Sequence, residues 1–242
     1  MLALTSMGAL GALSLLLNVD SALHALRPEQ IAAAGGPNAL KAAIIIQPIM
    51  LVVAASTLGL TLAHKIGLRS WVVDRLRGEA GTQIPLPPSL LTGAALGALI
   101  IGGDIVFAWA KPYAFSSIRA AEVSPIVSLF QGVLYGGLTE EILVRWGLLS
   151  GIAWLLVKVR LRTTIATWIA VVAAAMLFAA GHLPALAAVA ELNASLVART
   201  LLLNAIGGLA FGTLFVRHNL ESAMLAHMVA HVMFFIARLF GA

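Results

Sequence analysis

The 242-residue sequence contains no cysteine, and only 10% of its residues are charged. The missing cysteines exclude disulfides, thiolate metal ligands and a cysteine nucleophile. The scarcity of charge excludes a water-soluble exterior, because about a quarter of the residues in soluble domains are Asp, Glu, Lys or Arg. What is present is apolar: 61% of residues are hydrophobic and the mean hydropathy is +1.00. These values predict a polytopic membrane protein whose outer solvent is lipid.

About seven apolar segments, with six to eight as the range, are long enough to cross a bilayer. They lie near Ala3–Leu23, Ala42–Ile66, Leu90–Ala110, Ile126–Val157, Thr164–Gly181, Leu196–Val216 and Leu220–Phe240. The runs are continuous and rich in Ala and Leu, whereas the strands of membrane barrels alternate. We therefore expect an all-α transmembrane bundle.

Short breaks containing Pro and Gly separate the segments, so we predict one membrane-embedded domain over residues 1–242. The longest extramembrane piece, Lys65–Ser89, has Trp71 among arginines, a pattern typical of a short interfacial helix. The N-terminus lacks the positively charged start of a signal peptide and is expected to form the first span. Lys and Arg number eight on the side of the N-terminus and six on the other, which favours a cytoplasmic N-terminus.

Ionisable residues inside apolar segments are costly, so they mark functional sites by default. Glu141 and Arg145 are four residues apart and share a helix face, so the guanidinium can hold that carboxylate. Glu140 points about 100° away and is left to act as a general base toward water. The alternative is a structural Glu–Arg pair that fixes helix packing, with Glu140 facing a water-filled crevice.

Two later segments contribute histidines. His182 follows Phe178 by one turn at a helix end, where an imidazole can orient water, donate a proton or ligate a metal. His227 and His231 are one turn apart, a spacing that also suits two metal ligands on a helix. The alternative is that these histidines pack helices together through backbone hydrogen bonds.

Other residues have simpler interpretations. The pairs Gly132/Gly136 and Gly208/Gly212 form small-xxx-small faces, which predict close approach of a neighbouring helix. Asp20, Asp104 and Asn204 match no motif and are interpreted as packing or cavity residues.

The three ionisable clusters together resemble the signature of the CAAX protease and bacteriocin-processing family of intramembrane endopeptidases. The motifs are Glu140-Glu141…Arg145, Phe178…His182 and His227…His231. The resemblance covers residues 126–240 and implies a catalytic core there, in a helical bundle with a polar cavity. It implies that Glu140 activates water with support from Glu141 and Arg145. It further implies that His182 and His227 orient the water or the carboxylate, and that residue 231 stabilises the oxyanion. Position 231 departs from the family, which commonly has Asn or Asp there.

The resemblance thus implies hydrolysis of a peptide bond near the C-terminus, or in a membrane-proximal segment, of a membrane-associated protein or peptide. A metal-independent glutamate mechanism without a cofactor is favoured. The extra imidazole keeps zinc as an alternative, with Glu140, His182, His227 and His231 as ligands. The expected partners are the substrate and the bilayer and not nucleic acid. The expected location is that of a multi-pass integral membrane protein, in the plasma (inner) membrane if the source is bacterial. Alternative functions are a non-catalytic scaffold or bacteriocin self-immunity protein of the same family and, less favoured, an ion-coupled transporter.

Overall fold

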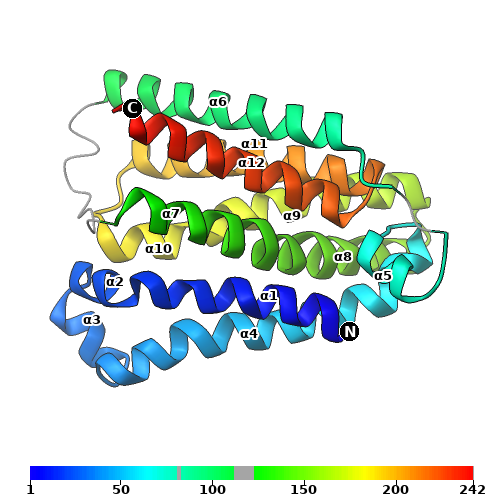
Figure 1. Cartoon of the computed structure of the whole chain (residues 1–242), viewed down its shortest axis with the longest axis horizontal. Coiled ribbons are helices and arrows are strands. Elements are labelled where there is room, and N and C mark those ends of the chain that lie inside the picture. The colour runs from blue at the N-terminus through cyan, green and yellow to red at the C-terminus, as the bar shows by residue number, and fades with distance from the viewer. Residues whose placement is uncertain (81–82, 112–122, 242) are drawn as a thin grey trace.

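A computed structural model describes residues 1–80, 83–111 and 123–241, and every regular element among these residues is helical (Figure 1). The elements outside the centre of the bundle are α1 (Leu2–Ser14), η1 (Leu15–Asn18), α2 (Val19–Ala25), α3 (Pro28–Ala33), α4 (Pro37–Leu62), η2 (Ala63–Ile66), α5 (Trp71–Leu76), α6 (Leu86–Ala110), α9 (Thr163–Gly181), α10 (Leu183–Val189), α11 (Ala194–Arg217) and α12 (Leu220–Leu239). The long helices run side by side along one axis. The predicted all-α class is confirmed.

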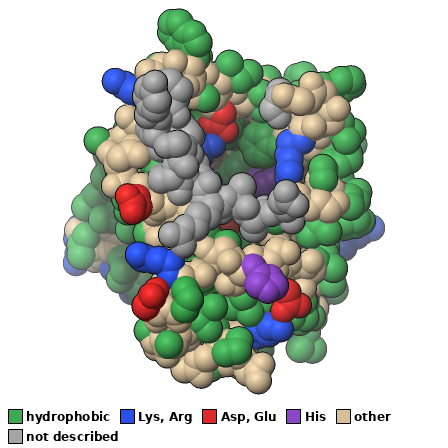
Figure 2. Space-filling view, turned by 90° about the vertical axis from the view of Figure 1, so that its left-hand side faces the viewer, with side chains coloured by type: hydrophobic (Ala, Val, Ile, Leu, Met, Phe, Trp, Pro, Cys, Tyr) green, Lys and Arg blue, Asp and Glu red, His purple; other side chains and the backbone are tan. Residues whose placement is uncertain are grey.

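Six helices of the described chain are long and apolar enough to cross a membrane. They are Leu2–Ala25, Pro37–Ile66, Leu86–Ala110, Thr163–Val189, Ala194–Arg217 and Leu220–Leu239. Each overlaps one of the seven predicted segments, so six predicted spans are confirmed as helices of spanning length and composition. Their apolar faces cover much of the outside, while acidic, basic and histidine side chains gather around and inside a hollow at one end of the bundle (Figure 2).

The remaining predicted segment, residues 126–157, is a run of consecutive helical elements in the centre of the bundle (Figure 1). They are α7 (Pro125–Gln131), the π-helical η4 (Gly132–Glu140) and η5 (Ile142–Leu149), and α8 (Ser150–Lys158). η4 packs against α1 and α12, and η5 packs against α4 and α9. The π-helical turns are rare and occur frequently at functional sites. Neighbouring helices bury Glu141 and Arg145 of this run completely.

Helix starts are found where the sequence places Pro or a side chain that can cap. Pro37 and Pro125 occupy the first turns of α4 and α7, where a missing backbone N–H costs nothing. Asn219 caps α12, and its Oδ1 accepts the backbone N–H of Ser222 at 2.9 Å. The predicted breaks between segments are therefore real helix boundaries.

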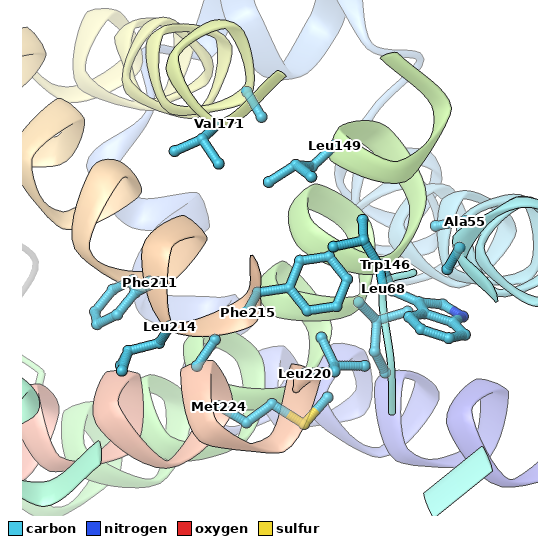
Figure 3. Packing of buried hydrophobic residues seen from close by; sticks show 14 of the residues in the cluster. Ala55, Leu68, Trp146, Leu149, Val171, Phe211, Leu214, Phe215, Leu220 and Met224 are labelled. Carbon is cyan, nitrogen blue, oxygen red and sulfur yellow. The ribbon is translucent and has the colours of Figure 1, made fainter. Parts of the chain in front are cut away.

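A single apolar core joins the helices at the end of the bundle near α5 (Figure 3). Trp146 is completely buried, and its ring meets the ring of Phe215 edge-on, with centroids 6.3 Å apart. α4 approaches this indole closely at Gly59, where a Cβ atom would overlap the ring. The core thus fixes η5, and with it the start of α8, against α4 and α11.

The predicted helix within Lys65–Ser89 is confirmed as α5, although residues 81–82 of that piece lie outside the described chain. Its attachment rests on Glu221, a buried residue in the first turn of α12. The Glu221 carboxylate accepts hydrogen bonds from Ser70 Oγ at 2.6 Å and from the backbone N–H groups of Trp71 at 2.7 Å and Val72 at 3.1 Å. These charge-assisted bonds tie α5 to the bundle.

The basic residues assigned to two sides of the membrane lie at opposite ends of the bundle. The end carrying α5 holds Arg75 and Arg217, whereas the opposite end holds Arg199 and Arg238, because α11 and α12 are antiparallel neighbours (Figure 1). Arg119, counted with the second group, lies outside the described residues. Which end faces the cytoplasm stays a prediction.

Candidate active site

The first motif places two adjacent carboxylates in different surroundings. Glu141 is completely buried, whereas Glu140 is 21% exposed and lines the main cavity. Glu141 Oε1 lies 3.1 Å from Arg145 Nη1, so the predicted ion pair is present. One carboxylate is thus held inside the protein and its neighbour faces the cavity.

Arg145 is buried between two aromatic rings. Its Cζ atom lies 4.8 Å from the centroid of Phe178 and 5.4 Å from that of Phe211. Aromatic faces attract a guanidinium, most strongly where water is excluded. Nη2 also donates to the carbonyl of Gly208 at 3.4 Å. The cation is therefore anchored to α9 and α11 as well as to Glu141.

His227 connects the buried carboxylate to the cavity. Its Nδ1 lies 2.7 Å from Glu141 Oε1, and because an ionised carboxylate only accepts, the ring donates from Nδ1. Its Nε2 lies 3.9 Å from Glu140 Oε2. The ring stacks on Phe211, with centroids 4.4 Å apart and an interplanar angle of 17°. In the neutral ring Nε2 therefore offers a lone pair beside Glu140.

His182, like His227, donates a hydrogen bond from Nδ1, but its acceptor is a backbone carbonyl. Its Nδ1 lies 2.8 Å from the carbonyl oxygen of Phe178, and a carbonyl oxygen can only accept. The Nδ1–H therefore donates, and Nε2 of the neutral ring is an acceptor. Both His182 and Phe178 line the cavity that Glu140 lines. The Phe-x-x-x-His spacing thus fixes a tautomer, since one helical turn brings the carbonyl to the ring.

His231 lies one turn further along α12 and also lines the cavity. Its ring stacks on that of His227, with centroids 5.1 Å apart, and meets Phe234 edge-on at 5.3 Å. Its ring–ring contacts in the described chain come from α12, and the ring also lies against Gly132 and Gly136 of η4.

The predicted glycine faces are where helices meet closely. A Cβ atom on Gly132 or Gly136 of η4 would collide with the rings of His231 or of His231 and His227. Gly208 of α11 meets the backbone of Ala175 in α9 in the same way. Both small-xxx-small predictions are confirmed, and the first pair lets the histidines of α12 lie directly against η4.

Substituting Gly132 by Ala is therefore expected to destabilise the protein by about 1–3 kcal/mol, because the added methyl group overpacks the His231 ring. Thermal unfolding in detergent would measure this change. Gly151→Ala is the matched control: nothing lies within 4 Å of a Cβ there, so the better helix propensity of Ala should raise stability by up to about 1 kcal/mol. Equal effects of the two substitutions would contradict the close packing of η4 on α12.

The cavity has a volume of about 610 Å³ and is walled by η1, α6, α7, η4, α9, α11 and α12. Glu140, His182, His227, Asp104, Arg199 and Arg238 all line it, and Figure 2 shows a hollow at one end of the bundle. Asp104 and Asn204 are cavity residues, as predicted. The prediction for Asp20 is wrong: its side chain is 72% exposed and pairs with Lys41, because α2 ends the first helix outside the bundle core.

Among the described residues, His64, Asp74 and Glu79 form the one group with three donor atoms within 4.8 Å of one another, and Arg69 pairs with both carboxylates. The set expected for zinc, Glu140, His182, His227 and His231, does not bring three donor atoms that close. His182 and His227 use Nδ1 for hydrogen bonds to a carbonyl and a carboxylate, which leaves their Nε2 atoms free to accept from water or to bind a metal.

Sequence reasoning missed Phe211, Arg199 and Arg238. Phe211 is one apolar residue in an apolar helix, and its stacking on His227 depends on how α11 lies against α12. The two arginines were interpreted as residues flanking the membrane. Arg238 follows His231 by seven residues on α12, a spacing that puts both on one helix face and could have found it, whereas Arg199 had no such signal.

One comparison with known proteins gave a match. A protein-family model described as type II CAAX prenyl endopeptidase, Rce1-like, matches residues 122–233 and so includes all three motifs. No curated protein and no solved structure matches the chain.

Proposed function

We propose that the chain, whose residues 122–233 match the family model of Rce1-like membrane endopeptidases, is such an endopeptidase and that Glu140 activates the water that cleaves its substrate. The proposed substrate is a membrane-associated protein or peptide, reached from the bilayer. One observation carries the mechanism: Glu140 faces the cavity beside His227 Nε2, while Glu141 is occupied by Arg145 and His227. A base must be free and must reach the reacting water.

The proposed reaction needs only groups on the cavity wall. A water molecule beside Glu140 donates one hydrogen to that carboxylate and the other to the Nε2 atom of His182 or of His227, and it gives the first proton to Glu140 as its oxygen attacks the peptide carbonyl. The C–O bond forms, and the carbonyl oxygen becomes an oxyanion that a ring N–H of His231 stabilises. Glu140 then passes the proton to the leaving nitrogen as the C–N bond breaks.

Glu141 and Arg145 act as positioning residues in this mechanism. Glu141 fixes the tautomer of His227 by accepting from Nδ1, so that Nε2 is the acceptor on the cavity side. Arg145 compensates the buried charge of Glu141. Neither residue lines the cavity, so neither touches the substrate in this proposal.

The proposal is tested by supplying the purified protein in liposomes with membrane peptides from its source and sequencing new C-termini in water enriched in ¹⁸O. We expect one ¹⁸O atom in each new carboxyl group, and the same yield with and without the zinc chelator 1,10-phenanthroline. Activity lost to the chelator and restored by zinc would replace the metal-independent mechanism by the zinc alternative. Absence of new C-termini with the wild-type protein would favour a scaffold or immunity protein.

A further inference from the structure

The positive charge of the protein is concentrated at the end of the bundle that carries α5 (Figure 1). Three acidic residues lie at this end, Asp74, Glu79 and Glu221, against eight basic residues, an excess of five positive charges. The eight are Lys65, Arg69, Arg75, Arg77, Lys158, Arg160, Arg162 and Arg217. The described residues of the opposite end include five basic and four acidic ones, an excess of one. The α5 end therefore attracts anionic partners.

The three carboxylates at the α5 end are already engaged. Arg69 Nη1 lies 3.5 Å from Asp74 Oδ1 and 2.8 Å from Glu79 Oε2. Glu221 is buried and accepts three hydrogen bonds from the start of α5. Residues 81–82, which follow α5 outside the described chain, are Gly and Thr and carry no charge. The other seven cations of this end form no ion pair among the residues that the structure describes.

Four of these seven cations lie around the turn that joins α8 to α9. Lys158 ends α8, and Arg160 and Arg162 belong to the turn. Arg217 ends α11, which packs along α9. All four side chains are exposed, and together they form what we call the basic turn surface.

Two of the four cations lie over tryptophan rings. Lys158 Nζ is 5.2 Å from the ring centroid of Trp154, and Arg217 Cζ is 5.9 Å from that of Trp168. A ring face attracts a cation but has no net charge, so the cation is positioned without being neutralised. Tryptophan is enriched where the hydrocarbon of a membrane meets its polar head groups. The basic turn surface is therefore at the level of the head groups.

Arg160 has a backbone conformation that favours glycine. Its φ of 72° is the one positive value among the described residues other than glycine. The turn ends α8, because Arg160 N–H donates to the carbonyl of Val157 at 3.0 Å and Leu161 N–H donates to that of Leu156 at 3.1 Å. Glycine is usual at such a position, since a Cβ atom is unfavourable there. The stability of the turn does not explain an arginine, so its side chain points to an interaction outside the turn.

Apolar side chains accompany the cations of this surface. Leu155, Val159 and Ile165 are large hydrophobic residues of the same stretch, and all three are exposed. A soluble anion would gain nothing from these side chains. A phospholipid matches both features, because its acyl chains lie along apolar residues while its phosphate reaches the cations.

We propose that the basic turn surface binds the head groups of anionic phospholipids in the leaflet that meets the α5 end. The lipid phosphate accepts charge-assisted hydrogen bonds from the guanidinium groups of Arg160 and Arg162 and from the ammonium group of Lys158. The acyl chains lie beside the exposed apolar residues of α8 and α9. This inference is independent of the proposed function, because none of these residues lines the cavity.

Binding of phosphatidylglycerol tests the proposal. The protein in neutral detergent micelles is titrated with dansyl-labelled phosphatidylglycerol, and energy transfer from tryptophan to dansyl is measured. The triple variant Lys158→Gln/Arg160→Gly/Arg162→Gln should bind on the order of a hundredfold more weakly. Each Lys or Arg contributes about 1 kcal/mol near an anionic lipid surface, and about 1.4 kcal/mol is a factor of ten.

Arg27→Gln/Lys41→Gln/Lys111→Gln is the matched control. It removes the same number of positive charges from the opposite end of the bundle. Charges that far from the basic turn surface are screened, since the Debye length is about 10 Å at 0.1 M salt. The control variant should therefore keep the wild-type affinity for phosphatidylglycerol.

Arg160→Gly separates lipid binding from folding. Glycine keeps the left-handed turn and removes one cation, so we expect roughly fivefold weaker binding, the equivalent of about 1 kcal/mol. The unfolding temperature in detergent should stay the same or rise, because glycine adopts this φ without strain. A residue with a purely structural role would not weaken lipid binding while stability is kept.

Three results would overturn the proposal. Equal weakening by the two triple variants would show that total charge matters and not this surface. Displacement of the labelled lipid by unlabelled phosphatidylcholine as effectively as by phosphatidylglycerol would show that the anionic head group is not recognised. Displacement by inorganic phosphate would assign the surface to a soluble anion.

Discussion

Glu140→Gln is expected to lower the cleavage rate by about 10²–10⁴-fold while the protein stays folded. Glutamine has the same shape but cannot take a proton from water. The substituted side chain is partly exposed to the cavity, so the change buries no new unpaired charge. Product formation at saturating substrate, together with the unfolding temperature in detergent, would measure both effects.

Glu29→Gln is the matched control for this substitution. Glu29 is an exposed residue of α3, outside the cavity, and its loss should leave the rate unchanged. Glu141→Gln is a second comparison, because it should impair catalysis through the orientation of His227 and should also shift stability. A Glu140→Gln protein that cleaves at the wild-type rate would remove Glu140 from the mechanism.

Arg145→Met is expected to destabilise the protein by about 3–5 kcal/mol, the cost of leaving one member of a buried ion pair without its partner. Glu141 would retain only His227 as a neutral partner, in a site where both Glu141 and Arg145 are inaccessible to solvent. The two rings that flank the guanidinium would also lose their cation. Thermal or denaturant unfolding in detergent would detect the change.

The double substitution Glu141→Gln/Arg145→Met tests whether the unpaired charge of Glu141 causes the loss of stability. It removes both charges at once, so it should recover much of the stability that Arg145→Met loses, as replacement of a whole buried pair is often close to neutral. Arg217→Met is the control for loss of an arginine that stacks on an aromatic ring, here Trp168, outside the site. A double variant no more stable than Arg145→Met would show that the arginine acts through packing and not through its charge.

The adjacent glutamates show how a helix separates two roles. Consecutive residues point in different directions, so Glu141 enters the protein interior while Glu140 meets the cavity. The interior carboxylate of Glu141 contacts both Arg145 and Nδ1 of His227. This contact directs Nε2 of the same imidazole toward the cavity. In the proposed mechanism, this protein without cysteine uses carboxylates and imidazoles for hydrolysis.

The membrane spans were predictable because they depend on local composition. Long apolar runs between Pro and Gly breaks specify helices wherever lipid is the solvent, and six of the seven predicted segments are such helices. The π-helical turns of η4 and η5 were not predictable, since they depend on i→i+5 hydrogen bonds that surrounding helices stabilise. Asp20 was misplaced because hydropathy does not distinguish the end of a helix from its middle.

Which residues share a helix face could be predicted from the sequence alone: Glu141 with Arg145, Phe178 with His182, and His227 with His231. Each pair is four residues apart, so the 3.6-residue turn of its own helix brings the two side chains together without contacts from other helices. The packing of the helices was needed to show that His227 binds Glu141, that Phe211 stacks on His227, and that Arg238 lines the same cavity. Those contacts join helices that are far apart in the chain. They depend on the distance between the helices, which is short where Gly132 and Gly136 have no Cβ atom.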